Sequence, residues 1–312
     1  MNALQTVAAD DNPTRPSDGS PHTDTGSARR WRLPRSAGWL GAVPLLVFAA
    51  VVFGLPAATM VFGAFMTPET MPGGARFTGA NMSASLHGPY VTALIGSIKL
   101  SAVSALIAAV VGLPIAHAVV TSRFRALREA ILAGAGVLAN FGGVPLAFAF
   151  VATLGNAGVL TTRFHLLGHG WNLYGFWGLT LVYLYFLIPL MVLTLAPALE
   201  GLRRHWREAA HNNGANAFRY WMHVALPILM PSLLGGYVLL FGTAFSAYAT
   251  AAAMVGSSVP LVTMQIADAL SGDVLVGQDN VALALGVDMV LVAGLVMAVQ
   301  VPLQRRSTRW LA

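Results

Sequence analysis

The chain has 312 residues, of which 56% are hydrophobic and 10% are charged, and its mean hydropathy is +0.67. Soluble domains average ~45–50% apolar and ~25% charged residues, so these values exclude an ordinary soluble domain. The net charge is +6, but the basic residues form short clusters between apolar runs. That pattern favours a membrane protein over a nucleic-acid-binding surface. Cysteine is absent, which excludes disulfides, thiolate metal sites and cysteine nucleophiles.

The first 38 residues differ in composition from everything that follows. They are rich in Asp, Pro, Ser, Thr and Gly and hold little that could be buried, so we predict a disordered cytoplasmic tail over residues 1–38. A cluster of arginines closes this segment just before an apolar stretch that runs to about Phe65. A secretory signal has an apolar core of only ~7–15 residues, so this stretch is predicted to be an uncleaved spanning helix.

Six apolar stretches are long enough to cross a bilayer, which takes ~20 residues of helix. The predicted fold class is therefore all-α: a polytopic membrane protein with six transmembrane helices. The predicted spans are residues 39–65, 90–120, 130–155, 173–198, 229–255 and 281–301, followed by a cytoplasmic tail over 302–312. Prolines and glycines within most of these spans indicate kinked helices that pack closely.

The basic residues predict the orientation of the spans. With the N-terminus inside, fifteen of the eighteen Lys and Arg residues fall in the two tails and the two inner connections. Only Arg76 and Arg163 fall outside, and Lys99 lies within a span. Basic residues are enriched on the cytoplasmic side of membrane proteins, so both termini are predicted to be cytoplasmic.

The second inner connection, residues 199–228, is longer than the other loops and is named here the coupling loop. Residues 203–213 contain no strong helix breaker, and Gly214 can end a helix there. Asn216 can cap a second helix that continues through Val224, and Leu226 and Pro227 are predicted to end it. The pattern indicates a helix-turn-helix that docks another protein at the cytoplasmic face.

The coupling loop also carries a family resemblance. Glu208-Ala209-Ala210, three residues, Gly214, nine residues, Val224, one residue and Leu226-Pro227 resemble the EAA loop of permease subunits of type I ATP-binding-cassette importers. The family's usual isoleucine is Val224 here, and Asn213 stands where an apolar residue is common. Together with the six spans, the resemblance covers residues 39–301. The alternative interpretation is an amphipathic surface helix with fortuitous spacing.

The resemblance implies a function and a set of partners. Residues 203–213 would form a coupling helix seated in a groove of a separate ATPase subunit. A second permease subunit, identical or homologous, and an extracytoplasmic solute-binding protein would complete an importer in the bacterial inner membrane. The residues expected to dock the ATPase subunit are Arg207, Glu208, Ala209, Ala210, Gly214, Leu226 and Pro227.

Catalytic residues are not expected in this chain. A phosphate-binding loop needs a lysine directly after glycine, whereas Lys99, the only lysine, follows Ile98. ATP hydrolysis is therefore expected on a partner subunit. No cofactor or metal is expected either, because His165 and His169 have helical metal-pair spacing but lie among glycines, which favours a structural role in an outer loop.

Three polar residues within the spans are candidates for the translocation path: Lys99, Asn140 and Asp288. Ionisable residues at such depth usually face the bundle interior and have a partner. Lys99 and Asp288 are expected either to pair, as a structural or a transport feature, or to face one another across the path. Residues 140–161 resemble permeases of the polyamine, phosphonate and ferric-iron branch of the family, which suggests these solute classes. An exporter or channel subunit is the alternative function, and a polytopic membrane enzyme is a further one that lacks a convergent catalytic set.

Overall fold

The structure is a computed structural model that describes residues 43–67, 76–255, 258–271 and 279–308. The predicted N-terminal tail, residues 1–38, lies outside this described part. The chain divides into two compact units, residues 1–52 and 53–312. The described part of the first unit is helical, and the second unit holds the bundle and the coupling loop.

The described segments are almost entirely helical, and their backbone order is as follows. The N-terminal span comprises α1 (Val43–Ala49), a π-helical turn (Ala50–Gly54) and α2 (Leu55–Ala64). The middle of the chain forms α3 (Ala80–Ser85), α4 (Gly88–Val120), α5 (Arg125–Asn140), α6 (Val144–Leu154), α7 (Val159–Arg163), a 3-10 turn (Leu166–His169) and α8 (Phe176–Glu200). The C-terminal part forms α9 (Arg204–Asn212), α10 (Ala217–Tyr220), a π-helical turn (Trp221–Ala225), α11 (Leu226–Phe245), α12 (Ala249–Met254), α13 (Val262–Ser271) and α14 (Asp279–Thr308).

Six helical segments are long and apolar enough to span a membrane, which confirms the predicted fold class. They are Val43–Ala64, Gly88–Val120, Val144–Arg163, Phe176–Glu200, Ala217–Phe245 and Asp279–Pro302. Four begin within five residues of the predicted limits, and the third and fifth differ more. The last helix, α14, continues to Thr308 and thus enters the segment predicted as a C-terminal tail.

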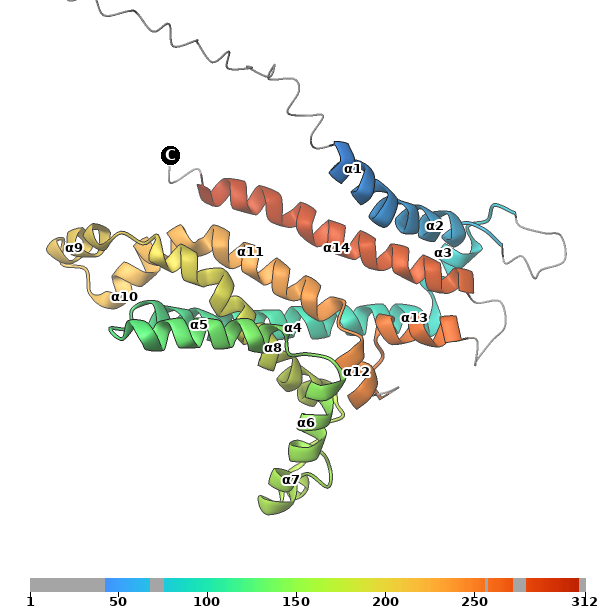
Figure 1. Cartoon of the computed structure of the whole chain (residues 1–312), viewed down its shortest axis with the longest axis horizontal. Coiled ribbons are helices and arrows are strands. Elements are labelled where there is room, and N and C mark those ends of the chain that lie inside the picture. The colour runs from blue at the N-terminus through green and yellow to red at the C-terminus, as the bar shows by residue number, and fades with distance from the viewer. Residues whose placement is uncertain (1–42, 68–75, 256–257, 272–278, 309–312) are drawn as a thin grey trace, which may run out of the picture. The chain divides into compact units, whose positions relative to one another are not determined.

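The core of the second unit is built around α8, which packs against α4, α5 and α11 (Figure 1). Its fully buried side chains include Tyr183, Leu187, Met191 and Leu195. Met191 lies at the point where three helices meet, because Cβ atoms added at Gly112 of α4 and at Gly236 of α11 would each come within 3 Å of its side chain. Small residues thus let the three helices approach closely, as the composition predicts.

The third predicted span, residues 130–155, is divided in two. Helix α5 ends at Asn140, and α6 begins at Val144 with a proline in its first turn. Between them Gly143 has a φ of +79°, a conformation that favours glycine, and its N–H donates to Thr250 Oγ1 at 2.9 Å. Helix α6 consequently leaves the direction of α5 and packs against α12, as Figure 1 shows.

The predicted helix end at Leu226-Pro227 is wrong. Backbone helix continues from Ala217 through a π-helical turn at Trp221–Ala225 into α11, with Pro227 in the first turn of α11. A proline lacks an N–H and crowds the carbonyl four residues earlier, and the wider π turn accommodates both defects without ending the helix. The same arrangement occurs at Pro56, which follows the π turn at Ala50–Gly54. The fifth predicted span, 229–255, accordingly begins earlier, at Ala217, and ends at Phe245.

Candidate docking loop and translocation face

The first half of the coupling loop is the short helix α9, which lies at one end of the bundle (Figure 1). Arg207, Glu208 and Ala209 are exposed on it, whereas Trp206 and Ala210 are half-buried. The guanidinium of Arg203 lies 5.9 Å from the centre of the Trp206 ring, a cation–π contact at the start of the helix. Helix α9 therefore presents a polar surface on which the small side chain of Ala209 leaves room for close contact with another protein.

The turn after α9 is fixed by backbone hydrogen bonds. Gly214 has a φ of +76°, its N–H donates to the His211 carbonyl at 2.9 Å, and the Ala215 N–H donates to the Ala210 carbonyl at 3.0 Å. These two bonds form a Schellman motif, which satisfies the last carbonyls of a helix. Asn216 then accepts the Arg219 N–H at 2.8 Å through its side chain and caps α10. Both predicted caps are confirmed.

The second half of the coupling loop is joined to the bundle. Trp221 in the π turn packs edge-on against His117 near the end of α4, with the ring centres 4.8 Å apart. The second half of the coupling loop thus contacts the end of α4 directly.

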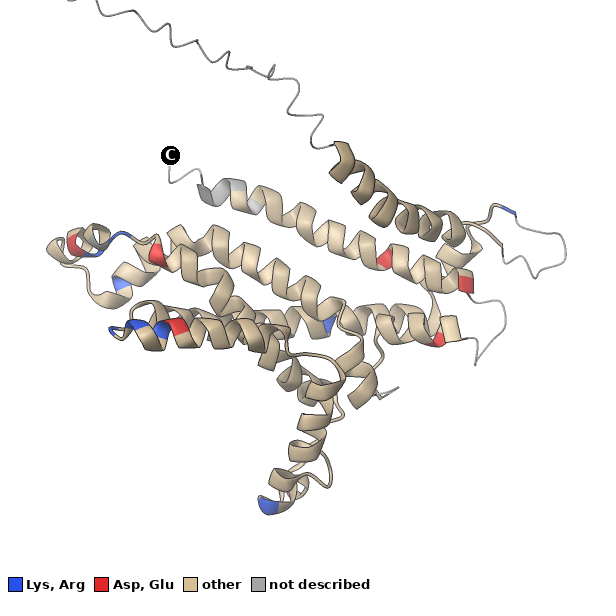
Figure 2. Ribbon diagram, in the orientation of Figure 1, with Lys and Arg blue, Asp and Glu red and all other residues tan. Residues whose placement is uncertain are grey.

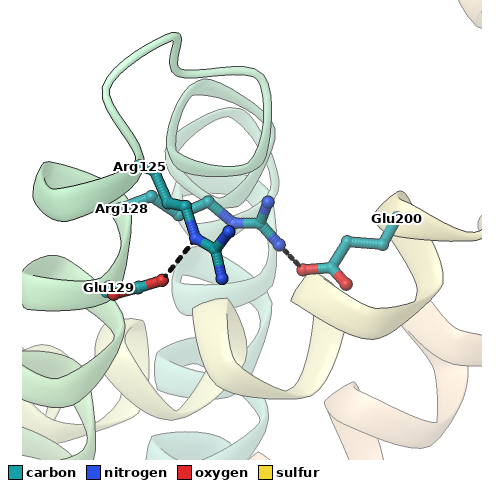
Figure 3. A network of polar contacts seen from close by, with 4 residues as sticks. All are labelled: Arg125, Arg128, Glu129 and Glu200. Atoms are coloured by element: carbon teal, nitrogen blue, oxygen red, sulfur yellow. Dashed lines mark hydrogen bonds and ion pairs between the residues drawn. The ribbon is translucent and has the colours of Figure 1, made fainter.

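Two ion pairs lie where α5 begins and α8 ends, at the edge of the coupling loop (Figure 3). Arg128 of α5 pairs with Glu200 at the end of α8. One turn away, Arg125 Nε lies 2.8 Å from Glu129 Oε1 within α5. Glu200 is the last residue of α8, so its bond to Arg128 holds the start of the loop against α5.

Charged residues are concentrated at this end of the bundle. Figure 2 shows basic residues, all of them arginine, gathered at α9, on α10 and at the start of α5, with acidic residues among them. The predicted docking residues fall into two groups within this region. Arg207, Glu208, Ala209, Ala210 and Gly214 lie on α9 and its turn, whereas the half-buried Leu226 and the exposed Pro227 lie in the first turn of α11.

The predicted path residues are not brought together. Lys99 and Asp288 are both described, and no ion pair joins them. Asp288 is 4% exposed on α14, next to Ser85 of α3, and its Oδ2 atom has no hydrogen-bond partner. Asn140 is exposed at the end of α5, where its side chain donates to the Gly136 carbonyl at 2.8 Å.

Lys99 instead lines a cleft of about 510 Å³ that sequence reasoning did not anticipate. Three segments far apart in the chain form it: residues 92–99 in the first half of α4, the start of α8, and residues 258–260 between α12 and α13. No pattern within one segment could have shown this juxtaposition. His165 and His169 take no part in it, and within the described ranges no group of three or more potential metal ligands occurs.

A helical bundle with six apolar spans and a capped two-helix loop at one end defines a polytopic membrane protein. Residues 108–309 match the family described as the binding-protein-dependent transport system inner membrane component, and the chain belongs to this family. The family resemblance seen in the coupling loop is thereby confirmed, and with it a location in the inner membrane.

Relatives of several kinds share parts of the sequence. The spermidine/putrescine transport system permease protein PotB of Haemophilus influenzae is 37% identical over 78 residues, 25% of this chain and 27% of the relative. A probable sulfate transport system permease protein cysT of Prototheca wickerhamii is 31% identical over 99 residues, covering 32% of this chain and 38% of the relative. The molybdenum transport system permease protein ModB of Mycobacterium bovis is 27% identical over 169 residues, 53% of this chain and 62% of the relative. The first two matches thus span between a quarter and two fifths of those relatives.

A solved structure shares the fold. The chain superposes on a chain of a bacterial ABC transporter involved in the import of the acidic polysaccharide alginate with a TM-score of 0.67. The superposition covers 87% of this chain and 96% of the other at 14% sequence identity. A structure of the bacterial alginate ABC transporter in complex with its pentasaccharide-bound periplasmic protein gives the same TM-score.

Proposed function

We propose that this chain is the membrane-spanning permease subunit of an ATP-driven solute importer and forms half of the translocation path. The coupling loop docks an ATPase subunit that hydrolyses ATP, a soluble binding protein delivers the solute, and a second permease subunit completes the path. Both termini and the coupling loop lie in the cytoplasm, an orientation supported by the arginines gathered at the loop end of the bundle (Figure 2).

The observation that carries the proposal is the coupling loop itself. A Schellman motif at Gly214 ends α9, and the Asn216 side chain caps the start of α10. These hydrogen bonds fix the turn between the two helices before any partner binds. Exposed Arg207 and Glu208 can form charged contacts with a partner, and the small side chain of Ala209 beside them allows a close approach. Preorganisation of this kind lowers the conformational cost of association.

The loop is also connected so that motion can pass to the membrane. The helix from Ala217 to Phe245 is continuous, so a push on the loop is transmitted along a rigid rod into the bundle. The contact between Trp221 and His117 joins the coupling loop to α4, and the ion pair between Arg128 and Glu200 joins α5 to α8. Rigid-body motion of packed helices is a common basis of alternating access.

The solute belongs to the classes carried by related permeases. The resemblance of residues 140–161 suggests a polyamine, a phosphonate or an iron complex. The named relatives add sulfate and molybdenum transport systems, and the structural neighbour imports an acidic polysaccharide. These candidates include both cations and anions.

Affinity purification from native membranes tests the proposal. The chain is solubilised in mild detergent, and co-purifying proteins are identified by mass spectrometry. Wild type is expected to recover an ATP-binding-cassette ATPase subunit, and Glu208→Arg is expected to lose it at equal abundance. Asp268→Arg is the matched control, because it reverses an exposed carboxylate on α13, away from the coupling loop, and it should retain the ATPase subunit. Absence of an ATPase subunit from the wild-type sample would instead favour a channel or an enzyme.

A further inference from the structure

The cleft that contains Lys99 is a cationic site within the membrane-spanning region. Lys99 lies about a third of the way along the 33-residue helix α4, and it is exposed in this subunit. No carboxylate in the described part of the chain pairs with it. A lysine at such a depth is costly in contact with lipid, so it faces protein or a water-filled cavity.

The residues that surround Lys99 in the cleft are polar or apolar but not acidic. The hydroxyls of Thr92 and Ser258 lie in the same lining, together with Phe176 at the start of α8. The lining contains no aspartate or glutamate. Both hydroxyls donate to backbone carbonyls, Thr92 to Gly88 and Ser258 to Tyr174 and Val255. The cleft therefore offers one positive charge beside two polar side chains, with no opposing negative charge. Its volume of about 510 Å³ lies within the range of small-molecule sites.

One wall of the cleft is irregular backbone held tightly against α4. A Cβ atom at Gly96 would overlap the Pro260 carbonyl oxygen, so glycine allows the close approach of this segment. Ser97 Oγ accepts the Val262 N–H at 2.9 Å and fixes the segment in place. Non-helical backbone at membrane depth is tolerated where it is buried in protein or lines a water-filled cavity, and the exposure of Ser258 and Pro260 in this subunit fits the second case.

We infer that the cleft around Lys99 is a solute-contacting site of the translocation path and that the transported solute is an anion. This inference rests on the proposed permease function and narrows its solute class. The ammonium group of Lys99 attracts an oxyanion or phosphonate group and donates hydrogen bonds to its oxygens. A polyamine would meet an uncompensated like charge in the same place.

The composition of the chain provides a selective probe, because Lys99 is its only lysine. The full chain in native membrane vesicles is treated with sulfosuccinimidyl acetate, a water-soluble reagent that acylates amines, with and without ATP. Acylation is measured by mass spectrometry of the purified chain. The Lys99→Arg variant keeps the positive charge but has no amine at this position, and it therefore corrects for reaction at the N-terminus. Sodium sulfate, molybdate and methylphosphonate are each added at equal ionic strength, with sodium chloride as reference. Hexamethonium chloride is the polycation, because its quaternary ammonium groups cannot consume the amine reagent.

We expect acylation of Lys99 in at least one nucleotide state and at least a threefold slower reaction with one of the three oxyanions, but not with hexamethonium. Failure of Lys99 to react in either state, equal rates with all salts, or protection by hexamethonium would each overturn the anion inference. Recovery of the ATPase subunit in the preceding purification distinguishes the two proposals. If the ATPase subunit is recovered and Lys99 is not protected, the solute class alone is wrong. If it is not recovered, the permease proposal fails whatever the labelling shows.

Discussion

Replacing Gly112 with alanine tests the three-helix junction at Met191, which holds α4, α8 and α11 together. The added Cβ would lie 2.9 Å from both Cβ and Cγ of Met191. Because Met191 Cβ is fixed to the backbone of α8, the helices themselves must move apart. Overpacking of this kind costs about 1–3 kcal/mol, against a helix-propensity gain of about 1 kcal/mol. We therefore expect Gly112→Ala to lower the free energy of unfolding by up to about 2 kcal/mol.

Two further glycines provide graded controls in α11. At Gly236 the added Cβ would meet Met191 Sδ at 2.8 Å, the flexible end of the side chain, so a change near zero is expected. At Gly242 nothing lies within 4 Å, and alanine should stabilise by about 0.5–1 kcal/mol. Unfolding of the purified chain by SDS in mixed micelles, followed by circular dichroism, measures all three. A Gly112→Ala variant as stable as Gly242→Ala would refute the close packing at this junction.

Three other predictions concern the coupling loop and the two charged residues Lys99 and Asp288. Gly214→Val places a β-branched residue at positive φ and should destabilise the end of α9 by about 1–2 kcal/mol, seen as faster amide hydrogen exchange there; unchanged exchange would contradict the Schellman turn. Asn216→Ala removes the acceptor of the Arg219 N–H and should cost about 1 kcal/mol, with exchange accelerated at Arg219 first. Lys99→Met and Asp288→Asn should have additive effects on unfolding within about 0.5 kcal/mol, since the two residues do not pair, and a larger coupling energy in the double-mutant cycle would show that they do.

Much of the fold follows from local sequence. The six spans can be predicted because ~20 consecutive apolar residues have few alternatives to crossing a bilayer. The caps at Gly214 and Asn216 can also be predicted, since each depends on one residue and its immediate backbone neighbours. These features need no knowledge of how distant segments pack.

The sequence interpretation was wrong where neighbouring turns or distant segments decide the outcome. Pro227 suggested a helix end, but the π turn before it lets the helix continue into α11. The third span looked continuous, yet it breaks at Gly143, whose N–H is bonded to Thr250 from a segment more than a hundred residues away. Proline and glycine weaken a helix locally, and the surrounding structure determines whether it ends, bends or continues.

Of the candidate sites, the coupling loop could be predicted from local sequence, whereas the surroundings of Lys99 and Asp288 could not. The coupling loop could be found because its residues lie within thirty positions of one another and their spacing matches a family pattern. Equal depth along two spans suggested that Lys99 and Asp288 pair, but depth does not determine which helix faces are adjacent. In the folded chain Asp288 lies against α3, whereas Lys99 faces the cleft with residues 258–260. Only the three-dimensional arrangement could separate these two residues.

Site-specific crosslinking from the coupling loop tests the central claim most directly. The chain has no cysteine, so a single Ala209→Cys variant can carry a photoreactive benzophenone maleimide without further changes. Arg163→Cys, at the end of α7, is the matched control. In native membranes we predict that illumination joins Ala209→Cys to an ATP-binding-cassette ATPase subunit, with a yield that changes on addition of ATP, whereas Arg163→Cys gives no such product. An ATPase adduct from Arg163→Cys, or none from Ala209→Cys in a folded and inserted chain, would contradict the proposed docking role.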